Sequence, residues 1–132
     1  MSILRQQPLA EGHMELRLVA QDQGVYQVTC AGPIVFPDFC PGHHDPFVQL
    51  LGPDVYAQRV LLSLEQAEYL DSSGVTWFLS CHRSFQAAGG VLVLHSIPHL
   101  VRYILQMLHI ERFLFVAPDL EAAQRLAWEK QS

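Results

Sequence analysis

Hydrophobic positions along this chain repeat every second residue in some segments and every three to four residues in others, and each period predicts a different element. Residues 14–20 and 25–30 alternate apolar and polar side chains and are separated by the polar turn 21–24. Alternation places every second side chain on one face of a strand, so these two runs predict a β-hairpin. Two further runs, 59–64 and 91–95, are mostly apolar and are bounded by turn residues, which predicts buried strands.

Apolar residues at helical spacing predict three helices in the second half of the chain. The first covers residues 74–88 and ends at Gly89-Gly90. The second follows Ser96, a candidate N-cap residue. A short strand at 113–116 then precedes a helix that Asp119 can cap and that ends near Trp128. The side chains expected on one face of the first helix are Val75, Phe78, Leu79, His82 and Phe85.

The proline-rich residues 33–52 form the least regular stretch, where Asp45 can cap a short helix over 46–51. Strands that alternate with helices predict an α/β layer with a mixed sheet, and the hairpin supplies its antiparallel part. We expect one domain over residues 14–132, preceded by a polar N-terminal arm, 1–13. Its sheet should have four to five strands, with helices packed mainly on one face.

Composition excludes several classes of protein. Of the 132 residues, 50% are hydrophobic and only 16% are charged, which is the opposite of a disordered chain. The net charge of −5, with Lys130 as the single lysine, argues against a nucleic-acid partner. No signal peptide is evident, and the most apolar window, 90–110, is too polar for a membrane span. Three cysteines without CxxC spacing indicate neither a disulfide framework nor a zinc knuckle. We therefore expect a cytoplasmic protein without direct membrane insertion.

Acidic residues are absent from one long segment. Asp71 and Glu111 bracket residues 72–110, which hold no carboxylate and only Arg83 and Arg102 as arginines. A buried core segment would exclude charges because burying a carboxylate is costly. The alternative is a neutral-to-basic face that meets a partner or an anion.

The stretch Asp71-Ser72-Ser73-Gly74 lies between a predicted strand and a predicted helix. Any of the first three side chains can satisfy the free N–H groups of the first helical turn. A helix N-terminus also favours added negative charge, including phosphate. The motif is therefore either a plain N-cap or a site suited to a covalent phosphate.

The joint spacing of these features resembles the STAS family, found in bacterial anti-sigma factor antagonists and in the tails of sulphate transporters. The resemblance is strong over about residues 58–128 and weak over 14–32. It implies a STAS-like α/β single domain with a mixed sheet. The matching features are the apolar strand 60–64, Leu70 to Gly74, Gly89-Gly90, the strand 91–94 and the helix 99–108.

The resemblance also implies a function without catalytic residues or a cofactor. In the antagonists, a partner serine kinase, itself the anti-sigma factor, phosphorylates the first serine after the aspartate. The unphosphorylated antagonist binds that kinase and frees the sigma factor, whereas the phosphorylated form does not bind. By position the phospho-acceptor here is Ser72, with Asp71 positioning the loop. Ser73 would cap the helix or serve as a second acceptor, and Gly74 would allow close backbone approach.

The helix after the motif is then the docking helix, with Thr76, Ser80 and Arg83 on its polar face as partner-binding residues. The chain departs from the family pattern in three places. Residues 31–35 and the proline-rich loop replace a segment that leads into a regular helix in the family. The resemblance therefore does not define the partner surface near residues 32–52. Ser63 stands where Asp or Asn is frequent, and His109 ends a helix where Gly is common, although His tolerates the left-handed conformation.

Other chemistry has weaker support in the sequence. His43-His44-Asp45 is a candidate metal site, but no second ligand pair at zinc spacing accompanies it, so we expect a solvated loop and no metal. A serine hydrolase would need a His base near Ser72 or Ser73, and the GxSxG elbow is absent. A non-switching STAS scaffold or transporter-accessory domain, and a small hydrolase or ligand-binding protein, remain as alternatives. The sequence does not determine the oligomeric state.

Overall fold

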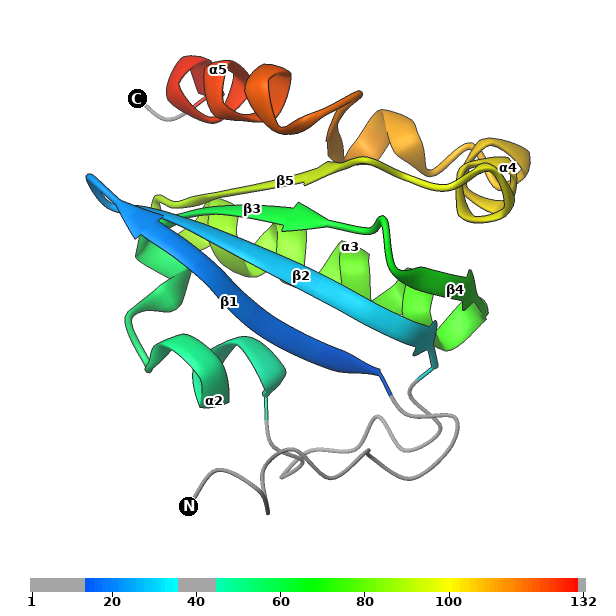
Figure 1. Cartoon of the computed structure of the whole chain (residues 1–132), viewed down its shortest axis with the longest axis horizontal. Coiled ribbons are helices and arrows are strands. Elements are labelled where there is room, and N and C mark those ends of the chain that lie inside the picture. The colour runs from blue at the N-terminus through cyan, green and yellow to red at the C-terminus, as the bar shows by residue number, and fades with distance from the viewer. Residues whose placement is uncertain (1–13, 36–44, 131–132) are drawn as a thin grey trace.

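The computed structural model describes residues 14–35 and 45–130 (Figure 1). The predicted N-terminal arm, Cys40 and the His43-His44 pair lie outside the described residues. The expected mixed α/β architecture is confirmed within the described ranges. None of the helices in these ranges is long and apolar enough to cross a membrane.

The sheet has six strands, one more than the four to five predicted. Five follow the order β1-β2-β3-β5-β6, in which β1 runs antiparallel to β2 and the other neighbours are parallel. The additional strand, β4, pairs with the end of β2, because β2 is ten residues long and extends past the end of β3. The strands are β1 (Glu15–Asp22), β2 (Val25–Ile34), β3 (Arg59–Ser63), β4 (Ala67–Leu70), β5 (Val91–His95) and β6 (Phe115–Ala117).

Hydrophobic cores form on both faces of this sheet. In β5, Leu92 and Leu94 face one core while Val91 and Val93 face the other, so the strand is buried on both sides, as its apolar run predicts. The larger core includes side chains of α2, α3 and α4, and the smaller core includes those of α5, which Figure 1 shows on the opposite side of the sheet from α2 and α3. The helices are α2 (Pro46–Leu51), α3 (Ser72–Ala88), α4 (His99–Met107) and α5 (Leu120–Lys130), with 3-10 turns η1 (Val55–Ala57) and η2 (Glu111–Phe113).

Two of the predicted N-caps are confirmed and one is wrong. Asp45 accepts hydrogen bonds from two backbone N–H groups of α2, and Asp119 accepts one from the N–H of Ala122 in α5. Ser96 caps nothing, because Pro98 holds the extended conformation that precedes α4 and the helix begins only after it. The Ser96 hydroxyl instead lies 2.9 Å from Nδ1 of His95.

The two predicted helix ends have the expected left-handed conformation, whereas the last strand begins later than predicted. Gly89 ends α3 with a φ of 89°, and His109 follows α4 with a φ of 57°, so both adopt the left-handed region. The last strand begins at Phe115 rather than at residue 113, because η2 occupies the residues before it.

Candidate functional site

The N-terminus of α3 lies directly after β4, and Asp71 is its N-cap residue. The Asp71 backbone is extended, and its N–H donates to the carbonyl oxygen of Ile34 at 3.5 Å. Its Oδ1 accepts from the N–H of Gly74 at 3.0 Å and from the hydroxyl of Ser73 at 2.6 Å. The prediction that Ser73 caps the helix is therefore wrong, because Ser73 lies inside the first turn and donates to the residue that caps it. These hydrogen bonds connect Asp71 both to β2 and to the first turn of α3.

The Asp71 carboxylate is stabilised in its ionised form. Partial burial acts to raise its pKa, but the hydroxyl of Ser73 and the backbone N–H groups at the start of α3 hydrogen-bond to the carboxylate. The hydrogen bonds outweigh burial and hold the pKa of Asp71 below its usual value. The site thus carries one negative charge at neutral pH.

The two adjacent serines have different environments. Ser72 is the first residue of α3, and its side chain is exposed, whereas Ser73 is half-buried. Within the described residues, the Ser72 hydroxyl makes no side-chain hydrogen bond, while that of Ser73 is engaged with Asp71. An enzyme can therefore reach the Ser72 oxygen without breaking the N-cap.

Gly74 allows the first turn of α3 to pack tightly against the ends of β2 and β4. A Cβ at this position would overlap the carbonyl oxygen of Ile34. It would also lie 2.6 Å from Cδ1 of Leu70 and 2.9 Å from Cγ2 of Ile34. Only a residue without a side chain fits, so the glycine determines how Ser72 is held relative to the sheet.

The rest of α3 separates into a buried face and an exposed face. Thr76, Ser80 and Arg83 are all exposed and follow one another at helical spacing, so they are accessible together with Ser72. The opposite side is anchored by aromatic contacts, among them Trp77, which stacks on Phe47 of α2 at 5.5 Å between ring centres. The hydrophobic pattern did not indicate that α2 would cover this part of α3.

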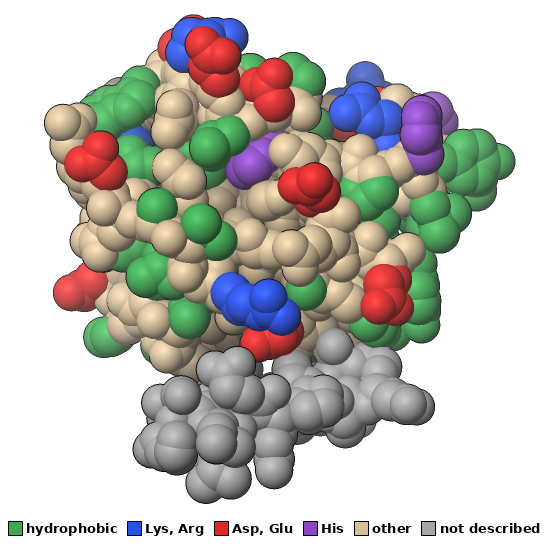
Figure 2. All heavy atoms as spheres, viewed as in Figure 1, with side chains coloured by type: hydrophobic (Ala, Val, Ile, Leu, Met, Phe, Trp, Pro, Cys, Tyr) green, Lys and Arg blue, Asp and Glu red, His purple; other side chains and the backbone are tan. Residues whose placement is uncertain are grey.

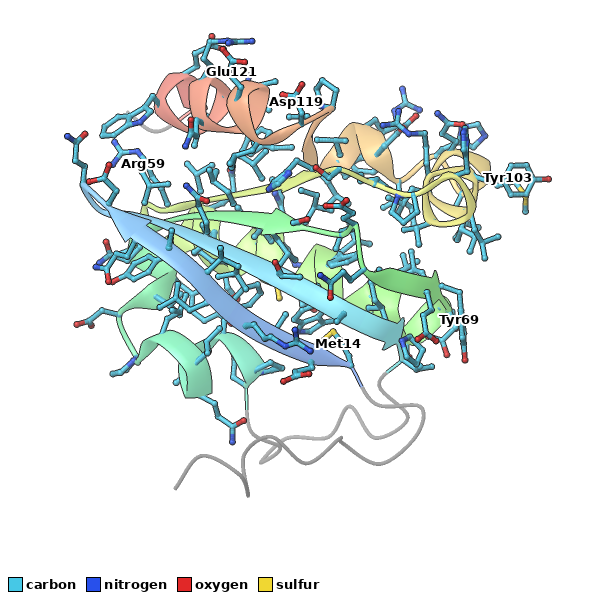
Figure 3. The ribbon with its side chains drawn as sticks, in the orientation of Figure 1. Met14, Arg59, Tyr69, Tyr103, Asp119 and Glu121 are labelled. Atoms are coloured by element: carbon cyan, nitrogen blue, oxygen red, sulfur yellow. The ribbon has the colours of Figure 1, made fainter. Side chains whose placement is uncertain are left out.

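The acid-free segment 72–110 is partly core and partly surface. All of β5 is buried, which agrees with the core interpretation. Yet α4 also exposes large apolar side chains, and Figure 2 shows hydrophobic side chains along the edge of the molecule where α4 and β4 lie. Figure 3 shows Tyr69 of β4 and Tyr103 of α4 projecting from that same end. This end of the molecule, where β4 leads into α3, therefore exposes two aromatic side chains.

The candidate metal motif and the cysteines can be located only in part, because His43, His44 and Cys40 lie outside the described residues. No group of three His, Cys, Asp or Glu residues in the described ranges is placed to hold a metal ion, and Asp45 of the candidate metal motif serves as the N-cap of α2. Cys30 and Cys81 are free and buried, and burial raises the pKa of Cys30 to about 12. Both thiols are therefore protonated at neutral pH and unsuited to act as nucleophiles.

One serine–histidine contact was not predicted from the sequence. Its two residues are neighbours in the chain, and Ser96 was expected to act as a helix cap instead. His95, only 5% exposed, contacts the Ser96 hydroxyl through Nδ1. Burial lowers the pKa of His95, and the charges of Asp119 and Glu65 oppose that shift. No carboxylate among the described residues hydrogen-bonds to the imidazole, so the pair lacks the acid that orients a catalytic base. His82, about two turns along α3 from Ser73, lies with its ring against that of Phe115.

Comparisons with known proteins agree with this architecture. The sequence model of the STAS domain matches residues 15–123. No curated protein matches the chain. Among solved structures, an anti-sigma factor antagonist from Mycobacterium paratuberculosis is similar with a TM-score of 0.68 and 15% identity, covering 90% of this chain and 97% of that one.

Two other similar structures carry related descriptions. A putative anti-sigma factor antagonist from Thermotoga maritima gives a TM-score of 0.64 at 16% identity, covering 87% of this chain and 94% of that one. The anti-sigma factor antagonist SpoIIAA in its unphosphorylated form gives 0.56 at 19% identity, covering 84% and 95%. At such identities the likeness shows the fold alone. The family match spans most of the chain, and the protein therefore belongs to the STAS domain family.

Proposed function

We propose that this protein is a regulator of the anti-sigma factor antagonist type, whose binding to a partner serine kinase is switched off by phosphorylation of Ser72. The observation that carries the proposal is the difference between the two serines of the motif. Ser73 donates its hydroxyl to the N-cap carboxylate, while Ser72 exposes its hydroxyl at the first position of α3. Ser72 is thus the acceptor that a kinase can modify without unfolding the helix.

The reaction itself belongs to the kinase. The Ser72 oxygen attacks the γ-phosphorus of the kinase's ATP, the bond to the β-phosphate oxygen breaks, and ADP leaves as the serine proton passes to a base of the kinase. The phosphate then lies at a helix N-terminus, where the helix dipole stabilises negative charge. This chain needs no catalytic residue or cofactor of its own. With an anti-sigma factor serine kinase as its partner, it would work in the cytoplasm.

The switch would operate through charge at the docking surface. A phosphate adds about −1.5 to −2 charges next to the ionised Asp71. The exposed residues that follow on α3, Thr76 and Ser80, are neutral and Arg83 is cationic, so the phosphate would concentrate negative charge at the start of this surface. A partner surface that fits the unphosphorylated form would then meet like charge and an unfavourable desolvation.

The test is phosphopeptide mapping after incubation with ATP and each anti-sigma-type serine kinase of the source organism. Ser72→Ala and Ser73→Ala form a matched pair, because each removes one hydroxyl from the same turn. We expect phosphate on the wild type and on Ser73→Ala, and none on Ser72→Ala. Phosphate on Ser73, or wild-type protein that binds a kinase tightly but never carries phosphate, would contradict the proposal. The second outcome would identify a non-switching STAS scaffold.

A further inference from the structure

A groove separates the C-terminal half of α3 from the segment that leads into β6. Its volume is about 620 Å³, and it lies outside the Asp71–Gly74 motif. None of the residues that line it is acidic. They are Leu79, His82, Arg83 and Gln86 from α3, and Arg112, Phe113, Leu114 and Phe115 from the opposite wall.

Two arginines of this groove have no carboxylate partner in the part of the chain that the structure describes. The ion pairs between described residues are Arg17–Glu15 and Arg125–Glu121, whereas Arg83 and Arg112 form none. Both are exposed, and they approach the groove from opposite walls. A guanidinium presents several N–H donors in a planar fork that matches a carboxylate. The polar chemistry of the groove thus suits a ligand with two or more carboxylates.

Aromatic side chains provide the apolar part of the groove. Phe113 is 61% exposed, and Phe115 contacts the His82 ring at 5.0 Å between ring centres. Arg112 lies with its guanidinium 6.0 Å from the centre of the Phe113 ring. In a ligand with an apolar group next to a carboxylate, the apolar group would therefore contact Phe113 while the carboxylate binds Arg112.

We propose that this groove binds an acidic segment of a partner protein, with carboxylates on Arg83 and Arg112 and an apolar side chain against Phe113. The groove wall formed by residues 112–115 continues into β6, so an extended protein segment fits it better than a compact ligand. This strand lies at the end of the sheet, and its outer edge has no strand partner among the described residues. The groove would give the protein a second point of attachment on α3.

The groove is electrostatically separate from the phosphorylation motif. Arg83 is eleven positions after Ser72 along the helix, which corresponds to about 16 Å at 1.5 Å per residue. This distance exceeds the Debye length of roughly 8 Å at physiological salt, so a phosphate on Ser72 is largely screened from Arg83. The inference goes beyond the proposed switch and does not require that Ser72 is phosphorylated.

The test is a nuclear magnetic resonance titration of the ¹⁵N-labelled, unphosphorylated full chain with the blocked peptide Gly-Asp-Phe-Glu-Leu-Asp-Gly. The matched control peptide replaces Asp by Asn and Glu by Gln, which keeps its shape and removes its charge. We expect saturable shifts of amide signals from residues 79–86 and 112–116 with the acidic peptide alone. Added salt should weaken this binding because the charges are exposed.

Variants of the chain identify the groups responsible. Arg83→Gln and Arg112→Gln should each weaken binding about fivefold, and the double variant more than tenfold. Arg125→Gln, which removes an exposed arginine of α5 instead, should bind like the wild type. Equal binding of the uncharged peptide, or unchanged binding by the double variant, would overturn the proposal. Shifts of the same signals on concentrating the protein alone, or on adding ATP, would assign the groove to a second copy or to a nucleotide and would also overturn it.

Discussion

The substitution Gly74→Ala tests whether the close contact at the start of α3 holds the motif in place. At an exposed helical position, replacing Gly by Ala stabilises a protein by about 1 kcal/mol, because Ala has the higher helix propensity. At this position the added methyl group would overlap the carbonyl oxygen of Ile34 and lie 2.6 Å from Cδ1 of Leu70. The oxygen belongs to the backbone of β2, so the methyl group cannot be accommodated by a side-chain rotation alone.

The magnitude follows from two opposing effects. Forcing a methyl group into a packed interior costs typically about 1–3 kcal/mol, and the upper part of this range applies where backbone must move. Movement of the helix start also strains the N-cap hydrogen bonds of Asp71, which contribute about 1 kcal/mol. After the propensity gain is subtracted, we expect a net loss of about 2 kcal/mol in the free energy of unfolding.

Urea denaturation followed by circular dichroism measures this loss, which corresponds to a fall of roughly 6–10 °C in Tm for a domain of this size. The matched control is Ser80→Ala on the exposed face of the same helix, which should leave stability unchanged or raise it slightly. A Gly74→Ala variant as stable as the wild type or more stable, with the same circular dichroism spectrum, would refute the reasoning. It would mean that α3 can shift on the sheet at little cost.

Two further predictions follow from other contacts. Asp71→Ala should lower the free energy of unfolding by about 1 kcal/mol at pH 7 through loss of the N-cap. Because the pKa of Asp71 is lower in the folded than in the unfolded state, its contribution is present at neutral pH and is lost as the pH falls through the folded pKa. The difference between wild type and variant should therefore shrink in acid denaturation series, and a constant difference would contradict this. Tyr56→Phe should leave the rise in tyrosinate absorbance below about pH 11 unchanged, since burial and the hydrogen bond to Asp45 raise the pKa of Tyr56. Loss of about a quarter of that rise, one of the four tyrosines, would show the hydroxyl to be accessible.

Much of the fold follows from local patterns that tertiary packing leaves intact. The apolar runs around Leu61 and Val93 predict strands buried on both faces, and each face has its own core. The four-residue strand β4 was missed because only its end residues, Ala67 and Leu70, are buried, so it shows no alternation. The residue type of Ser96 predicts an N-cap, whereas the conformation imposed by Pro98 decides where α4 begins.

The candidate site was predictable in outline but not in its division of roles. The order Asp-Ser-Ser-Gly before a helix indicates an N-cap, and all three polar residues are chemically able to provide it. Only the three-dimensional geometry shows that Asp71 caps while Ser73 donates to it and Ser72 is left exposed. The groove was not predicted because Arg83 and Arg112 are far apart in the sequence and meet only through the packing of α3 beside β6.

The most direct test of the central claim is a calorimetric titration of the partner kinase with three forms of the protein: wild type, Ser72→Ala and Ser72→Asp. The account predicts that Ser72→Ala binds like the wild type, because the exposed hydroxyl makes no hydrogen bond with the described residues. Ser72→Asp should bind at least about tenfold more weakly, because it places a second carboxylate beside Asp71 at the docking surface. Equal affinities for the alanine and aspartate variants would contradict a charge-based switch at Ser72.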